Sequence, residues 1–160
     1  MQQRRQRRGL VRQLLRKHRI LRSQRVLGLL DEAFCDVELR IDIANGLPNV
    51  RVDAGMMQQA LLNIALNACQ AMPGGGRLRL GASSASGKRV EIVCEDTGPG
   101  IKPEHLDRIF DLYFTTKDSG SGIGLSMVYR AVQLHDGEIQ VQSTLGRGAT
   151  FRIWLPQASA

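Results

Sequence analysis

AGMMQQALLNIALNACQAM, residues 54–72, is the stretch that decides how this 160-residue chain folds. Its apolar residues recur at helical spacing, and Pro73 and the three glycines after it end the helix. Gln59, Asn63 and Asn67 follow one another at i,i+4 intervals, so their amides form a stripe on one face. Buried amides must find partners. Capping of nearby backbone would explain one of them, whereas three in line favour a ligand rich in oxygen atoms together with a hard cation.

Outside this helix, the sequence alternates between strand and helix patterns. Residues 37–43 alternate apolar and polar side chains, as a half-buried strand does. Further strands are expected at 76–82 and 88–95, joined by a Ser/Gly-rich hairpin, and at 137–143 and 149–155. Helices are expected at 26–34, 103–109 and 123–135. This order predicts an α+β fold, a two-layer sandwich with helices on one face of a mostly antiparallel sheet.

The composition is that of one soluble globular domain. Apolar residues make up 42% and charged residues 23% of the chain. No apolar run reaches the ~18 residues of a membrane helix, and the arginine-rich N-terminus lacks the apolar stretch of a secretory signal. Three cysteines lie far apart in apolar segments: Cys35, Cys69 and Cys94. This pattern favours reduced core thiols over disulfides or zinc, so we expect a cytoplasmic domain, within a full-length protein that can be membrane-anchored.

Positive charge is concentrated at the N-terminus. Residues 1–30 hold ten of the 22 Lys and Arg residues and no Asp or Glu, which leaves 12 basic and 15 acidic residues in 31–160. We therefore expect a basic helix at 1–25 and a domain at 26–160. The basic segment carries apolar residues at helical spacing. A bundle helix explains them better than nucleic-acid binding does, because the segment has no aromatic residue to stack on a base.

A second candidate element is Asp96-Thr97-Gly98-Pro99-Gly100, directly after the strand expected at 88–95. A carboxylate at a strand end, beside glycines that let the backbone come close, can accept a hydrogen bond from a ligand. Adenine has an exocyclic amine where guanine has a carbonyl, so an ionised Asp favours adenine. A turn initiated by the aspartate explains the same residues equally well.

Glycines also mark the start of the helix expected at 123–135. The run Gly120-Ser121-Gly122-Ile123-Gly124-Leu125-Ser126 exposes backbone N–H groups at the positive end of the helix dipole, where phosphate groups bind. No Gly-Lys-Ser/Thr follows, so the run is not a Walker loop. No strand leads into it, so it is not a dinucleotide fingerprint either.

In their order, these elements resemble the catalytic domain of the sensor histidine kinases, within the gyrase, chaperone, histidine kinase and mismatch-repair ATPase superfamily. Residues 59–68 resemble the family's N box, 96–101 (DTGPGI) its first glycine box and 109–117 (IFDLYFTTK) its phenylalanine box. Residues 120–125 match the second glycine box, and 146–151 (GRGATF) the final Gly-x-Gly-x-Thr-Phe strand. The resemblance covers residues 26–156. It implies a mixed five-stranded sheet backed by three helices, with ATP between the N-box helix and a lid at 111–123.

The resemblance also implies roles for the residues that match the motifs. Asn63 would bind Mg²⁺ and Asn67 the phosphates, while Asp96 would hold the adenine amine, with Thr150 as a second polar contact through water. The glycines would shape the pocket floor (Gly98, Gly100) and wrap the triphosphate (Gly120, Gly122, Gly124). Ile101 and Leu125 complete the two glycine boxes as further nucleotide contacts.

The lid would be anchored by packing of Phe110 and Phe114. Many relatives carry a Lys or Arg three residues after the second N-box asparagine, where this chain has Gln70. One cationic contact with the phosphates would then be missing, or Lys117 would supply it from the lid.

Two departures from the family bear on the mechanism. The ATPases of the superfamily place a Glu, as general base for water, where this chain has Gln59, which cannot take a proton. Gln59 therefore favours transfer to a protein acceptor over hydrolysis. The family's acceptor is a histidine closely followed by an acidic residue on a long helix, and none of His18, His105 and His135 has that setting. The acceptor would then lie on another segment or another chain, and this chain would be inactive alone.

The resemblance therefore predicts the ATP-binding catalytic domain of a two-component sensor histidine kinase, a transferase with ATP and Mg²⁺ as cofactors. Its expected partners are a histidine-containing dimerisation domain and the receiver domain of a response regulator. The full-length protein would be a homodimer, and no nucleic acid is expected among its partners. Residues 1–25 would be the end of the dimerisation helix or a linker. Two alternatives stay open: an anti-sigma-type serine kinase, and an ATP-binding module that signals without catalysis.

Overall fold

Five strands form one mixed sheet in the computed structural model, which describes residues 37–117 and 120–158. Their spatial order is β1-β2-β3-β5-β4. Strands β1 and β2 pair in parallel and all the other neighbours are antiparallel. The strands are β1 (Val37–Ile43), β2 (Gly76–Ala85), β3 (Arg89–Asp96), β4 (Glu138–Ser143) and β5 (Ala149–Pro156). The predicted α+β fold with a mostly antiparallel sheet is thus confirmed.

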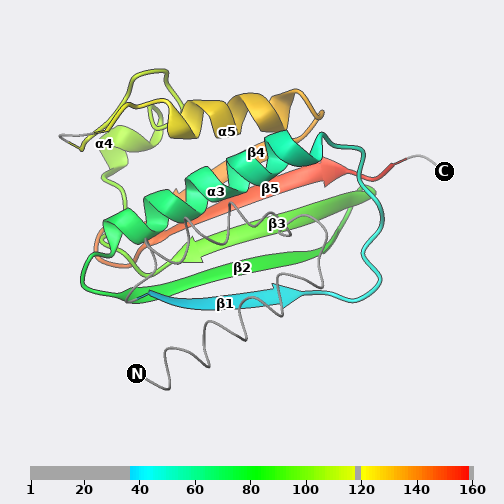
Figure 1. Cartoon of the computed structure of the whole chain (residues 1–160), viewed down its shortest axis with the longest axis horizontal. Coiled ribbons are helices and arrows are strands. Elements are labelled where there is room, and N and C mark those ends of the chain that lie inside the picture. Colours follow the sequence, from blue (N-terminus) through cyan, green and yellow to red (C-terminus); the bar gives the residue numbers. More distant parts are fainter. Residues whose placement is uncertain (1–36, 118–119, 159–160) are drawn as a thin grey trace.

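Two long helices cover one face of the sheet (Figure 1). They are α3 (Ala54–Ala71) and α5 (Gly124–Gln133), and they contact each other along that face. The short helix α4 (Pro103–Leu106) ends earlier than the expected 103–109, because turns follow it. The helices expected at 1–25 and 26–34 lie outside the described residues, as does Cys35.

Strand alternation separates a buried face of the sheet from an open one. Along β5, the residues Ala149, Phe151, Ile153 and Leu155 are buried and those between them are not. The buried side chains pack against the helices, where Ile64 of α3 and Val128 of α5 belong to the same core. Each fully buried side chain of this size contributes about 1.5–3 kcal/mol to folding.

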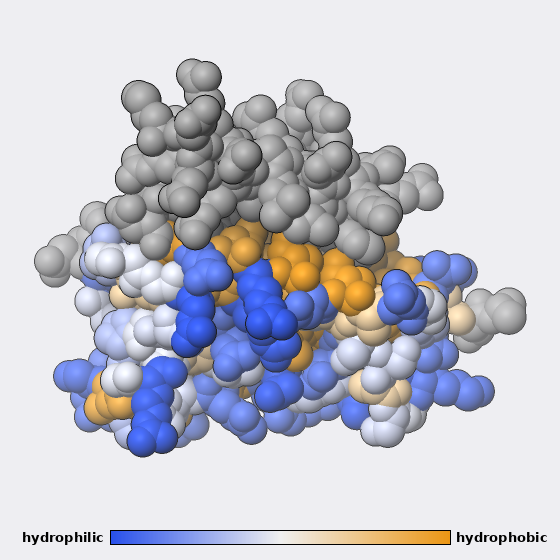
Figure 2. Space-filling model, turned by 90° about the horizontal axis from the view of Figure 1, so that it is seen from below, coloured by the Kyte–Doolittle hydropathy of each residue, from blue (hydrophilic) through white to orange (hydrophobic). Residues whose placement is uncertain are grey.

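The open face of the sheet carries charged side chains that pair across strands. Arg79 lies 3.0 Å from Glu95, Arg89 3.1 Å from Glu138 and Arg152 3.3 Å from Glu91. The first two pairs are exposed on both sides, and exposed pairs of this kind add little stability. Seen from below, hydrophilic side chains cover much of the surface, and a band of hydrophobic side chains crosses it (Figure 2).

The two cysteines in the described residues are free and buried. Burial raises the pKa of the Cys69 thiol to about 12, and the Asp96 carboxylate adds to the effect. Burial likewise raises the pKa of Cys94. These thiols therefore stay protonated and belong to the core. No helix of the described residues is both long enough and apolar enough to cross a bilayer.

Candidate functional site

The amide stripe of α3 meets the beginning of α5. Asn63 is half-buried, and its Nδ2 donates to the Gly124 carbonyl at 3.2 Å. Its Oδ1 accepts from Gln59 Nε2 at 3.1 Å. Gly124 is the first residue of α5, and a Cβ on it would lie 3.9 Å from Asn67 Nδ2 and 4.0 Å from Asn63. The structure therefore brings the amides of α3 and the N-terminus of α5 together.

Asp96 ends β3 at the other end of the site and is only 8% exposed. Its Oδ1 accepts from the backbone N–H groups of Gly98, at 2.8 Å, and Ala149, at 3.3 Å. Burial raises the pKa of Asp96, the two hydrogen bonds counteract that rise, and neighbouring Glu95 adds to it. Among the described residues no donor reaches Oδ2, and no enclosed side-chain oxygen lacks a partner. Oδ2 is therefore accessible to a ligand.

Glycines around Asp96 are required because the backbone segments approach closely. Gly148 has φ +86°, and a Cβ there would overlap the Asp96 carbonyl. Gly100 has φ +76°, and a Cβ there would overlap the Thr144 carbonyl. A Cβ on Gly98 would lie 2.9 Å from Asp96 Oδ1 and 3.3 Å from Met72 Cγ. Gly98 and Gly100 therefore fit the predicted floor, which adjoins the C-terminal end of α3.

Aromatic contacts hold the beginning of the loop at 111–123. The Phe114 ring meets His105 edge-on, with centroids 5.5 Å apart, and Arg108 lies 4.7 Å from its centroid. Phe110 contacts Tyr129 of α5 and Phe151 of β5, at centroid distances of 5.6 and 6.5 Å. Both phenylalanines are thus placed as anchors of the loop.

A backbone hydrogen bond joins the two ends of the same loop. Tyr113 N–H donates to the Gly122 carbonyl at 3.0 Å. Gly122 has φ +65°, and a Cβ on it would meet the Tyr113 backbone. Gly120 packs against Thr115 and Lys117. Gly120 and Gly122 therefore shape the loop itself, whereas Gly124 lies against the amides.

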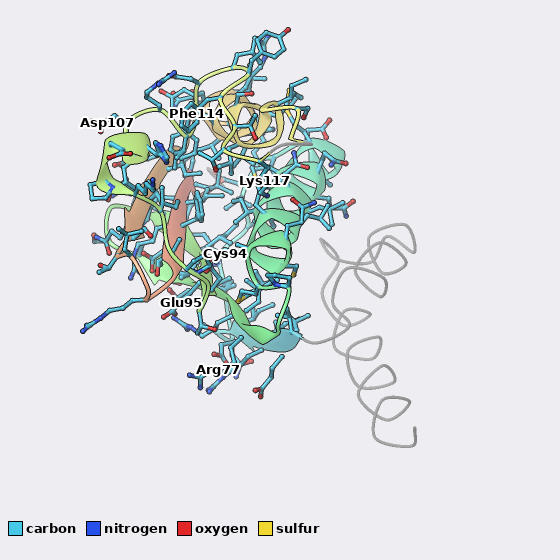
Figure 3. All side chains as sticks on the ribbon, turned by 90° about the vertical axis from the view of Figure 1, so that its left-hand side faces the viewer. Arg77, Cys94, Glu95, Asp107, Phe114 and Lys117 are labelled. Carbon is cyan, nitrogen blue, oxygen red and sulfur yellow. The ribbon has the colours of Figure 1, made fainter. Side chains whose placement is uncertain are left out.

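Lys117 connects this loop to α3. Its Nζ donates to Asn67 Oδ1 at 3.0 Å and to Gln70 Oε1 at 2.7 Å. Partial burial of its ammonium group lowers the pKa of Lys117. Figure 3 shows Lys117 beside α3, and Phe114 on the side of α4. A cation thus lies on the amide stripe between Asp96 and Asn63.

Three residues expected among the nucleotide contacts lie elsewhere or have another environment. Thr150 alternates with buried Ala149 and Phe151, so it faces the open side of the sheet, opposite Asp96. In this geometry the Ala149 backbone N–H, and not the Thr150 side chain, lies beside Asp96. Ile101 and Leu125 are half-buried and pack against the core.

His135 is a positioning residue that the sequence did not indicate. Its Nε2 accepts from the backbone N–H of Asp53 at 2.8 Å, and its Nδ1 lies 2.6 Å from the Ala131 carbonyl, to which it must donate. Asp53 in turn caps α3 through Met56 N–H, at 2.7 Å. His135 therefore fixes the end of α5 to the start of α3, and its position after a helix was the available signal.

Two surface hollows lie away from this site. The larger, of about 590 Å³, is on the open face of the sheet, beside Gly81 and Val93, and the other, of about 420 Å³, is beside His135. Neither contains Asp96 or the amide stripe. The charges around the larger hollow pair with one another, so we do not assign a ligand to it.

Comparison with known proteins gives a family and a set of relatives. Residues 52–159 match the family described as histidine kinase-, DNA gyrase B-, and HSP90-like ATPase. Sensor histidine kinase ZraS of Escherichia coli (strain K12) is 44% identical over 121 residues, which are 76% of this chain and 26% of ZraS. This chain therefore spans about a quarter of that relative.

Solved structures show the same fold. The mycobacterial sensor histidine kinase MprB is 28% identical, with a TM-score of 0.74 over 85% of this chain and 92% of that one. Full-length ShkA, solved in complex with AMPPNP, is 33% identical, with a TM-score of 0.76 over 94% of this chain and 30% of that one.

Proposed function

This chain belongs to the histidine kinase-, DNA gyrase B- and HSP90-like ATPase family, and we propose that it transfers the γ-phosphate of Mg²⁺-ATP to a histidine on another segment. The similar curated proteins are sensor histidine kinases, and the matched part is their ATP-binding catalytic domain. The transfer, the metal and the partners are the proposal. One observation carries it: an accessible carboxylate oxygen at Asp96 lies at one end of a site whose other end is lined by amides, a lysine and a helix N-terminus.

The Asp96 end suits the adenine base. Asp96 Oδ2 is accessible, while Oδ1 is held by two backbone N–H groups, so the carboxylate is fixed before a ligand arrives. An exocyclic amine would donate to Oδ2, whereas the carbonyl of guanine would be repelled. Gly98 leaves room beside the carboxylate, since any side chain there would crowd Oδ1 and Met72.

The other end suits phosphates and a hard cation. Gly124 begins α5, so the N–H groups of the first turn of α5 and the helix dipole favour an anion beside Gly124. Asn63 Oδ1 has one lone pair engaged by Gln59 and a second to offer, so a single amide ligand for Mg²⁺ fits this position. When bound, Mg²⁺ would supply charge neutralisation between phosphate oxygens. Asn67 and Lys117 would contact the phosphates beside it.

The described residues offer neither a base for water nor a histidine placed to accept phosphate. Gln59 is a neutral amide engaged with Asn63. His105 packs on Phe114, and both ring nitrogens of His135 are engaged. The domain would therefore act by positioning and electrostatic stabilisation. A dimerisation domain would supply the histidine, a response regulator would receive the phosphoryl group, and the full-length protein would be a homodimer.

Phosphotransfer from labelled ATP to a separately supplied dimerisation domain tests this function. The expected result is an acid-labile label on that domain, because phosphohistidine hydrolyses in acid, and no label on this chain alone. Asn63→Ala is the control that lacks the amide oxygen for the metal. Acid-stable label would indicate a serine kinase, and binding of ATP with no transfer would indicate a signalling module; either result would overturn the proposal.

A further inference from the structure

Lys117 is held on α3 by two neutral groups. The amide oxygens of Asn67 and Gln70 orient its ammonium group at 3.0 and 2.7 Å but leave its charge in place. An ammonium group has three donors, and these two bonds use two of them. One donor and the whole positive charge are therefore left for an anion.

Gln70 makes the shorter of the two bonds, although its own position on the helix is exposed. It lies about one turn along α3 from Asn67, toward the end where Met72 meets Gly98. Without this acceptor, only Asn67 would hold Lys117. The long lysine side chain would then sample more rotamers and would lose that freedom when it binds a phosphate. Prior placement removes part of that cost.

We propose that Gln70 is a positioning residue for nucleotide binding, which holds the Lys117 ammonium over the middle of the site so that it meets the phosphates of a bound nucleotide. This inference rests on the proposed function. Gln70 would act through its bond to Lys117 and not through a contact with the phosphates. The helix α3 provides the acceptor, Gln70, and the loop provides the positive charge, Lys117.

A merely structural role for Gln70 would have different consequences. If the bond only fastened the loop to α3, its loss would affect any ligand of the site, with or without phosphates. A role of Gln70 that does not pass through Lys117 would also persist in the Lys117→Gln background. A double-mutant cycle between the two residues, measured on ligands with and without phosphate, separates the two roles.

The experiment is calorimetry on the whole chain, with Mg²⁺-ATP and with adenosine as ligands. The variants are Gln70→Leu, Lys117→Gln and their combination. Gln58→Leu is the matched control, since Gln58 is a glutamine of α3 about 100° around the helix from Gln59 and outside the amide stripe.

We expect Gln70→Leu to weaken Mg²⁺-ATP binding by about three- to fivefold, in the range of an exposed charge-assisted contact. Gln70→Leu should leave the affinity for adenosine unchanged, and Gln58→Leu should leave the affinity for Mg²⁺-ATP unchanged. The effect of Gln70→Leu on Mg²⁺-ATP affinity should vanish in the Lys117→Gln background. Equal losses for ATP and adenosine, a loss that persists without Lys117, or no loss at all would each overturn this inference while leaving ATP binding in place. Failure of the unaltered chain to bind Mg²⁺-ATP would instead overturn the proposed function, and the inference with it.

Discussion

Backbone atoms hold the Asp96 end of the site, whereas side chains hold much of the Lys117 end. At the first end, two N–H groups bind a buried carboxylate, and Gly148 packs against the carbonyl of the same residue. At the second, Lys117 makes side-chain bonds to α3, and nearby Tyr113 is 70% exposed. A buried backbone arrangement opens at a higher free energy than an exposed loop does. The comparison indicates a preformed site for the base and an adjustable site for the phosphates.

The largest expected effect comes from disturbing the rigid end. Gly148→Ala should lower the free energy of unfolding by about 3–4 kcal/mol, because a Cβ would overlap the Asp96 carbonyl in a left-handed conformation. Gly146→Ala is the matched control: Gly146 has φ +75° but no atom within 4 Å of the added Cβ. That variant should lose only about 1–2 kcal/mol, the cost of the left-handed conformation. Denaturant midpoints measure both, and equal losses would show that the close approach is unimportant.

The layers of the fold could be predicted from local patterns. The alternation in 37–43 predicted β1 with the bounds that the structure shows, and Pro73 with its glycines predicted the end of α3 within one residue. Strand β2 continues to Ala85, past the expected residue 82, because Ser83 and Ser84 pair with Glu91 and Val90. Their small polar side chains suggested a loop. Their pairing across the β2–β3 hairpin makes them part of the strand, although their side chains do not indicate one.

A substitution of Asp96 should separate ATP binding from folding stability at the Asp96 end of the site. Asp96→Asn should weaken ATP binding by about 1.5–3 kcal/mol, since the charged acceptor is lost, and should leave the unfolding midpoint nearly unchanged or higher, since a buried charge is removed. Calorimetry and denaturation on one sample test both halves. Glu95→Gln, on the open face, is the control that should change neither by much. A large loss of stability with unchanged affinity would mean that Asp96 is structural.

Protonation of Asp96 at low pH should weaken ATP binding as the Asp96→Asn substitution does. Burial raises the pKa of Asp96 in the folded chain, so the folded state keeps this proton to a higher pH than the unfolded chain does. The free energy of unfolding should therefore fall as pH rises between the unfolded and the folded pKa. ATP affinity should change in the opposite direction, and decrease as pH falls through the folded pKa. The difference in pH dependence between the wild type and Asp96→Asn isolates this group from the titration of ATP, and parallel curves would contradict the assignment.

The site was predictable only in part. The spacing of Gln59, Asn63 and Asn67 placed three amides on one face, and the structure has them there. The contact of Lys117 with Gln70 depends on the path of a loop, which no periodicity describes. Thr150 faces away from Asp96, and the strand pattern indicates this: the neighbours of Thr150 on both sides, Ala149 and Phe151, are apolar and buried, which puts Thr150 on the open face.

A smaller effect is expected at the adjustable end. Hydrogen exchange in peptides covering residues 111–123 should slow when ATP with Mg²⁺ is added and slow less with ADP, because the γ-phosphate is the group that this loop would contact. Peptides covering Asp96 to Gly100 should already exchange slowly and change little. Equal protection of residues 111–123 by ATP and ADP would contradict the contact with the γ-phosphate. A larger change around Asp96 would contradict the claim that the Asp96 end is the preformed one.

The most direct measurement is calorimetric binding of ATP and GTP, each with Mg²⁺, to the unaltered chain. The account predicts much tighter binding of ATP, because Asp96 Oδ2 accepts from the adenine amine and opposes the guanine carbonyl. It also predicts that Asp96→Asn reduces this preference. Equal affinities for the two nucleotides would contradict the claim that a preformed carboxylate reads the base.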